Sequence, residues 1–180
     1  MSSDLQVPSF ITVAGAAWGL FGVVLLLAFA VFRLGGEFYL ALQVEWNTYQ
    51  WTALVLNLLF MAYSEGYKGF QLSYAPRVAA RARSLLTSDN KMRLCLAPLF
   101  CMGYFHTTRR RLISSYVLTA LIICAVLAFR LIPQPWRGVL DAGVALGLCW
   151  GLIALLIFGA RALFSDSYAY SPELPEPLRS

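Results

Sequence analysis

The sequence predicts an all-α polytopic membrane protein, a bundle of four transmembrane helices. Of its 180 residues, 59% are hydrophobic and 13% are charged, and the mean hydropathy is +0.67. A soluble domain carries about 25% charged residues, so the composition excludes a soluble globular protein. It also excludes disordered, collagen-like and disulfide-rich secreted chains. Four apolar runs are long enough to cross a bilayer core about 30 Å thick, which needs roughly 20 residues.

The first predicted span covers residues 10–32, which are apolar except for Thr12. It is too long for a cleaved signal peptide, and no Lys or Arg precedes it. Gly35-Gly36 is expected to end its helix. The second span, about residues 46–65, lies in a stretch from Glu37 to Glu65 without Gly or Pro. We expect one long helix there that tilts or projects beyond the bilayer.

The third and fourth spans cover about residues 112–132 and 138–160. Pro133-Gln134-Pro135-Trp136 joins them, and its prolines predict a tight connection. The remaining residues, 165–180, form a polar, proline-containing tail that is expected to be extended, disordered or a short docking segment. Residues 1–164 are thus expected to be a single transmembrane domain.

A shorter apolar segment, Leu94–Phe105, is interrupted by Pro98 and Gly103. Its 12 residues are too few to cross a bilayer, so we expect a re-entrant or interfacial segment rather than a span. It belongs to a basic tract, residues 66–111, with nine Lys and Arg residues and Asp89 as its one acid.

The basic tract also predicts the orientation of the chain, because Lys and Arg near span ends stay on the cytoplasmic side. With four crossings, eleven basic residues lie on one side and three, Arg33, Arg130 and Arg137, on the other. Both termini are therefore expected in the cytoplasm, and the protein in an inner or plasma membrane.

Within the tract, Pro76 can open a helix over residues 77–86. Its apolar residues fall on one face and Arg77, Arg81 and Arg83 flank that face, which is typical of a helix lying in the membrane interface. Such a helix can bind anionic lipid headgroups or an acidic partner. The alternative is that these arginines only set the topology. A basic patch alone is no specific sign of nucleic acid, so no nucleic-acid partner is expected.

The strongest candidate binding site is Glu65 at the inner end of the second span, facing basic residues of the tract. Ionisable groups at membrane depth are costly and often functional. The alternative for Glu65, for Asp141 and for Arg130 is ordinary ion pairing at span ends, and Asn57 is expected to form an interhelical hydrogen bond. The candidate binding residues are Glu65, Arg77, Arg81, Arg109, Arg110 and Arg111.

Two glycine stripes predict close helix packing, because small residues let helix backbones approach each other in lipid. Gly143, Gly147 and Gly151 recur every four residues on the fourth span, and Gly15 and Gly19 lie on one face of the first. The stripes either pack spans one and four together within one chain or face a partner, which could be a second copy.

The sequence offers no catalytic constellation. His106 is the one histidine, the four cysteines form no C-x-x-C pair, and no nucleotide-binding or nucleophile-elbow motif occurs. We expect no metal and no cofactor, and an enzyme is disfavoured but left open. Three function classes remain: an accessory, assembly or interaction subunit of a membrane complex, a small solute or ion transporter or channel, and a lipid-headgroup enzyme. The first class agrees best with a sequence that has no recognisable catalytic residues.

Overall fold

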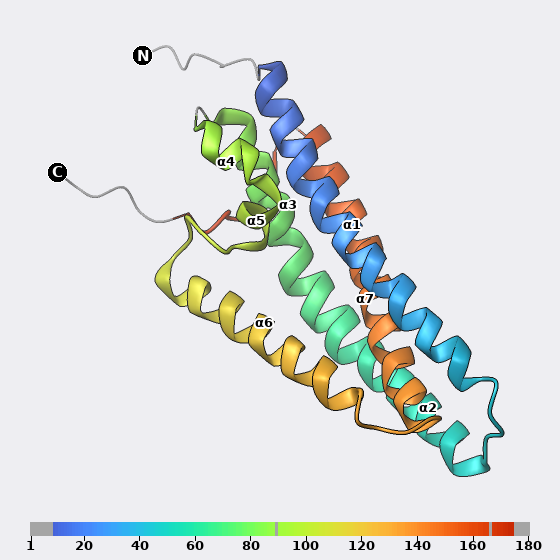
Figure 1. The fold of residues 1–180 in the computed structure, drawn as a ribbon. Helices are drawn as coiled ribbons and strands as arrows, with labels where there is room; N and C mark the ends of the chain where they lie inside the picture. The colour runs from blue at the N-terminus through green and yellow to red at the C-terminus, as the bar shows by residue number, and fades with distance from the viewer. Residues whose placement is uncertain (1–8, 89, 166, 175–180) are drawn as a thin grey trace, which may run out of the picture.

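The computed structural model describes residues 9–88, 90–165 and 167–174, and the regular elements in them are all helical (Figure 1). In chain order they are α1 (Phe10–Ala41), α2 (Thr48–Met61), the π-helix η1 (Ala62–Tyr74), α3 (Ala75–Ser84), the 3₁₀ turn η2 (Leu85–Thr87), α4 (Lys91–Cys95), α5 (Ala97–Met102), α6 (Arg109–Phe129) and α7 (Trp136–Phe164). The predicted all-α class is confirmed for this part of the chain.

Three helices in the described ranges, α1, α6 and α7, are long and apolar enough to cross a membrane, not the four that the sequence predicts. The second predicted span differs because its α-helical winding stops at Met61. α2 has 14 residues, a length of about 21 Å at 1.5 Å per residue. The three long apolar helices are compatible with a membrane protein.

The backbone continues from α2 through η1 into α3 without a break and runs back alongside α1 and α7 (Figure 1). η1 has 13 residues, whereas most π-helical segments are single turns within α-helices. Its hydrogen bonds run between residues i and i+5, so residues four or five apart share a face. This winding places Glu65, Gly66 and Phe70 against α7, in register with Gly147, Trp150 and Gly151.

The helix of the first span does not end at Gly35-Gly36, as the sequence predicts, but continues to Ala41. Glycine weakens a helix interior by about 1 kcal/mol relative to alanine, which tertiary contacts can offset. Ala41 is fully buried, and its carbonyl accepts a hydrogen bond from Trp46 Nε1 at 2.7 Å. Asn47 and Gln50 then form a reciprocal capping box that starts α2.

The helix predicted over residues 77–86 is α3, but its surroundings differ from those of an interfacial helix. Val78, Ala79 and Ala82 are at most 2% exposed, and α3 packs against α1, α5 and α7. The reason is that α3 extends the long α2–η1 helix into the centre of the bundle end, where protein covers it on several sides. The apolar segment 94–105 forms the short helices α4 and α5, which pack on α1 and α3.

α6 stands apart from the other long helices (Figure 1). None of its 21 residues is buried, although it is as apolar as α1 and α7. Its N-terminal half is held by Tyr104, whose hydroxyl lies 2.5 Å from Thr119 Oγ1 and whose ring contacts Tyr116 edge to face. Most side chains in the rest of α6 are exposed.

Candidate functional site

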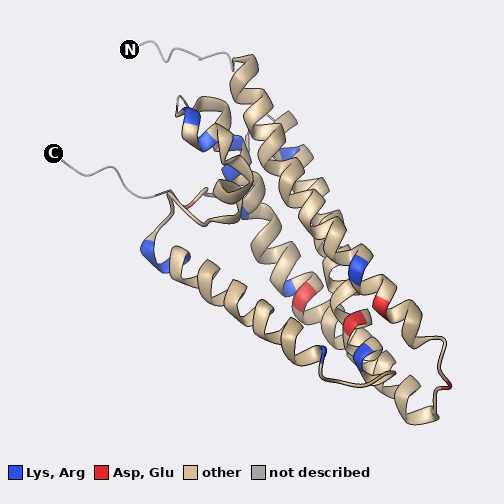
Figure 2. Ribbon diagram, viewed as in Figure 1, with Lys and Arg blue, Asp and Glu red and all other residues tan. Residues whose placement is uncertain are grey.

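Lys and Arg residues gather at the end of the molecule formed by α3, α4, α5 and the start of α6, whereas most of the acidic residues lie toward the opposite end (Figure 2). The arginines of this basic end are not equivalent. Arg81 is buried and bonded to the main chain, Arg77 and Arg111 line a small pocket together with Arg81 and an acidic tail residue, and others are exposed.

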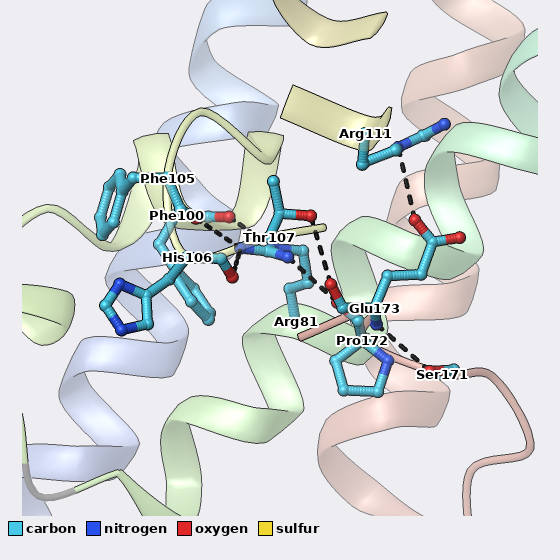
Figure 3. Close-up of polar contacts among 9 residues, drawn as sticks. All are labelled: Arg81, Phe100, Phe105, His106, Thr107, Arg111, Ser171, Pro172 and Glu173. Carbon is cyan, nitrogen blue, oxygen red and sulfur yellow. Dashed lines mark hydrogen bonds and ion pairs between the residues drawn. The ribbon is translucent and has the colours of Figure 1, made fainter. Parts of the chain in front are cut away.

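Arg81 is the most buried of these arginines, with 4% of its surface exposed. Its guanidinium donates hydrogen bonds to four main-chain carbonyls (Figure 3). Nε donates to Phe100 O at 2.6 Å, Nη2 donates to Phe105 O at 2.9 Å and to His106 O at 3.1 Å, and Nη1 donates to Pro172 O at 3.0 Å. The guanidinium carbon also lies 4.2 Å from the centre of the Phe100 ring.

These contacts explain how a buried arginine is tolerated without a carboxylate bonded to it. Burial lowers the pKa of Arg81 to about 10, so the side chain keeps its charge at neutral pH. The carbonyl oxygens and the Phe100 ring replace the water that the guanidinium loses. Arg81 therefore fastens the segment after α5 and the C-terminal tail to α3, and four of its five N–H donors are used in these contacts.

The described part of the tail, residues 167–174, lies against the basic end. Tyr168 donates a hydrogen bond to Pro76 O at 3.0 Å, and the Tyr170 ring contacts Phe158 edge to face. Thr107 Oγ1 donates to Glu173 O at 3.2 Å. Residues 175–180 of the predicted tail lie outside the described residues. The tail thus docks through residues on α3, on α7 and in the loop before α6.

A small pocket opens beside the Arg81 contacts. Its cavity of about 20 Å³ has room for one water molecule. On one side, Arg111 Nε lies 3.6 Å from Glu173 Oε2 (Figure 3). On another, Arg77 Nε is buried and has no hydrogen-bond partner among the described residues. Burial, and then the nearby charge of Arg111, lower the pKa of Arg77. The pocket lining is Tyr74, Arg77, Val78, Arg81, Cys101, Met102, Gly103, Arg111, Pro172 and Glu173.

The structure therefore separates the candidate binding residues of the sequence analysis. Arg77, Arg81 and Arg111 line one pocket, whereas Arg109 and Arg110 are exposed and do not line it. Glu65 is in η1, and no ion pair joins it to the arginines in the described part of the chain.

The glycine stripe of α7 faces α2 and η1. A Cβ added at Gly143 would lie 2.1 Å from Asn57 Nδ2, and one at Gly147 would lie 3.1 Å from Glu65 Cβ. Asn57 Nδ2 also donates a hydrogen bond to Val139 O on α7 at 2.7 Å, an interhelical bond of the expected kind. A Cβ at Gly151 would be 2.4 Å from the Phe70 ring. Close helix contact at this stripe leaves no room for side chains.

The stripe of α1 faces α4 and α5 rather than α7. A Cβ at Gly15 would lie 2.4 Å from Leu94, and one at Gly19 would lie 2.8 Å from Cys101 Sγ and 3.1 Å from Ala97 Cβ. Each stripe therefore contacts a different element of the same chain. α1 and α7 do pack against each other within the chain, as one alternative of the sequence analysis expected, but the two stripes themselves lie at other contacts.

An ion cluster lies at the opposite end of the bundle. Arg137 Nη2 is 2.8 Å from Glu37 Oε1 on α1, and Arg137 Nε is 3.5 Å from Asp141 Oδ2 on α7. Asp141 is 3% exposed. The sequence analysis gave ordinary ion pairing as one alternative for Asp141, and the structure pairs it with Arg137. The contact with Glu37 is absent from the sequence analysis because it joins residues that are 100 positions apart in the chain.

The described residues contain no group of three His, Cys, Asp or Glu side chains that could hold a metal ion. Comparison of the chain with profiles of known protein families, with curated proteins and with solved structures finds no match. The functional argument consequently depends on the geometry described above. Sequence reasoning missed Glu173, which had no motif around it, and it missed the unpacked state of α6.

Proposed function

We propose that the protein is a non-catalytic subunit of a membrane complex and that α6 binds a transmembrane helix of another membrane protein. The observation that carries this proposal is that none of the residues of α6 is buried, whereas α1 and α7 are packed against other elements.

α6 also carries small residues at the spacing that favours helix association in lipid. Ala120, Cys124 and Ala128 recur every four residues, and all three are exposed. The glycine stripes of α1 and α7, in contrast, already contact other parts of the chain. The small-residue stripe of α6 is therefore open to a partner helix.

We also propose that α2 and η1 together make a fourth crossing. α1 and α6 run in the same direction along the molecule (Figure 1), so the chain must return between them if both cross. α2 and η1 form that return, and they pack against α7. With the basic end on the cytoplasmic side, in accordance with the positive-inside rule, both termini are cytoplasmic.

The proposal can be tested with a photo-crosslinking amino acid at position 127 in the native membrane. Leu127 lies on the face of the small-residue stripe and is 56% exposed, and Leu25 on α1, 55% exposed, is the matched control position. We expect a discrete crosslinked protein from position 127 and only lipid adducts from position 25. Ala120→Leu should abolish that crosslink and leave the free energy of unfolding within about 0.5 kcal/mol of the wild-type value, because Ala120 is exposed on α6.

Lipid adducts alone at both positions would overturn the proposal. A crosslink between two copies of this chain would replace the accessory subunit with a self-associating one. A crosslink that survives Ala120→Leu would show that the small-residue stripe is not the contact face.

A small transporter remains the second candidate because Asn57 and Glu65, two polar residues at membrane depth, both face glycines of α7. Such residues often mark substrate paths in membrane proteins. Glu65→Gln should then abolish solute uptake by reconstituted vesicles while expression is unchanged. Unaltered behaviour would leave Glu65 a packing residue of η1.

A further inference from the structure

We propose that Arg77 and Arg111 form a binding site for the phosphate of an anionic lipid headgroup, and that the Glu173 carboxylate of the tail occupies this site when no lipid is bound. The site is separate from the exposed face of α6 and does not depend on a partner protein.

The charges of the pocket favour an anion stronger than one carboxylate. Arg77, Arg81 and Arg111 line the pocket, and Glu173 is the one acid in its lining. Arg81 bonds to carbonyl oxygens and lies over an aromatic ring, and these contacts do not neutralise its charge. The pocket therefore keeps an excess positive charge with the tail docked.

The hydrogen-bond geometry is also incomplete. The Glu173 carboxylate lies 3.6 Å from Arg111 Nε, which is longer than a charge-assisted hydrogen bond of about 2.7–2.9 Å. Arg77 Nε has no hydrogen-bond partner within residues 9–88, 90–165 and 167–174. A phosphate group carries more acceptor oxygens than a carboxylate and can accept hydrogen bonds from two guanidinium groups at once. It can therefore bond to Arg111 and Arg77 together.

The position of the pocket fits a lipid rather than a distant solute. Arg111 is in the first turn of α6, a helix long and apolar enough to cross the membrane. A residue at the end of such a helix lies near the headgroup layer. With the tail docked, the cavity holds about one water molecule, so a headgroup phosphate must displace the Glu173 carboxylate.

Displacement of Glu173 needs little rearrangement of the main chain. The Pro172 and Glu173 carbonyls are held by Arg81 and by Thr107, and neither contact involves the Glu173 carboxylate. The side chain can swing out while these bonds persist. Lipid binding then removes one of the tail's attachments and leaves the others in place.

The test is the affinity of the full-length protein for phosphatidylglycerol, measured by native mass spectrometry in detergent, with phosphatidylcholine as the uncharged comparison. Arg77→Gln and Arg111→Gln should each weaken phosphatidylglycerol binding at least roughly tenfold, since each removes a hydrogen bond from a charged group. Arg110→Gln, an exposed arginine beside the pocket, is the matched control and should change the affinity less than about twofold.

Glu173→Gln should strengthen phosphatidylglycerol binding by roughly two- to fivefold, because a partly exposed ion pair no longer competes with the lipid. Glu45→Gln removes the same charge from an exposed position in the loop before α2 and should have no effect. If an arginine-to-glutamine variant fails to fold, Arg77→Lys and Arg111→Lys keep the charge and test the loss of the planar guanidinium.

Four results would overturn the proposal. Equal losses from Arg110→Gln and Arg111→Gln would indicate a diffuse basic surface. An unchanged affinity in Glu173→Gln would show that the tail does not occupy the site. Displacement of phosphatidylglycerol by an equal concentration of inorganic phosphate, or equal binding of phosphatidylcholine, would remove the anionic lipid as the ligand.

Discussion

Gly143→Ala tests the close contact between α7 and α2 with the smallest possible change. The added methyl group would lie 2.1 Å from Asn57 Nδ2, 2.9 Å from Asn57 Cγ and 2.9 Å from Met61 Cγ. Ordinary contacts begin near 3.4 Å, so α2 and α7 must separate or Asn57 must turn away. If Asn57 turns, its 2.7 Å hydrogen bond to Val139 O is lost.

The expected destabilisation follows from three effects. Overpacking a close contact costs about 1–3 kcal/mol, and an interhelical hydrogen bond in a membrane contributes about 0.6 kcal/mol. In the opposite direction, alanine stabilises a helix by about 0.5–1 kcal/mol relative to glycine. We therefore expect Gly143→Ala to lower the free energy of unfolding by roughly 1–3 kcal/mol.

The free energy of unfolding can be measured by denaturant titration in mixed micelles, followed by circular dichroism. Gly36→Ala is the matched control, because nothing lies within 4 Å of a Cβ at Gly36 in α1, and it should be neutral or stabilising. In an Asn57→Ala background the cost of Gly143→Ala should fall by at least about 0.5 kcal/mol. The reasoning is refuted if Gly143→Ala behaves like Gly36→Ala, or if Asn57→Ala leaves its cost unchanged.

Three further predictions concern the basic end. Arg81→Met should lower the free energy of unfolding by roughly 3 kcal/mol, since buried carbonyls lose their donors. Arg81→Lys should lower it by less. A denaturant titration in which Arg81→Lys is the less stable variant would contradict the four-carbonyl contact. Burial raises the pKa of the Cys101 thiol to about 12, so maleimide labelling at pH 8 should be at least roughly a hundredfold slower than in the denatured chain, and comparable rates would mean an accessible thiol. Burial also raises the pKa of Tyr168 to about 12. The neutral phenol is therefore favoured in the docked tail, so the tail's docking should be fully stable below pH 10 and weaken as the pH rises through 12. The tyrosinate absorbance titration of the wild type minus that of Tyr168→Phe gives the titration of Tyr168 alone. A midpoint near that of an ordinary phenol in this difference would contradict the prediction.

The helical class and the long apolar helices could be predicted from the sequence, because they depend on long apolar runs and few charges. The interruption of the second span could not be predicted, since hydropathy reports polarity and not whether residues 62–74 wind as an α- or a π-helix. The end expected at Gly35-Gly36 was wrong for a related reason. Local helix propensity is weak beside the packing that buries Ala41.

The candidate site was partly visible in the sequence, because the basic tract contains Arg77, Arg81 and Arg111. The difference between these arginines and the exposed Arg109 and Arg110 was not visible. It arises from where α3 ends and how the tail returns to it, which are contacts between segments up to about 90 residues apart. Main-chain carbonyls supply the acceptors for Arg81. Every residue type has a main-chain carbonyl, so no pattern of side chains in the sequence marks the contact.

The Arg81 contacts have a consequence for how this protein can change during evolution. The guanidinium bonds to main-chain carbonyls at positions 100, 105, 106 and 172. Three of those positions can therefore be substituted as long as the backbone keeps its path. Phe100 is the exception, because its ring also covers the charge. Among descendants of this sequence we therefore expect an invariant arginine surrounded by variable neighbours, a pattern that a comparison by local similarity would overlook.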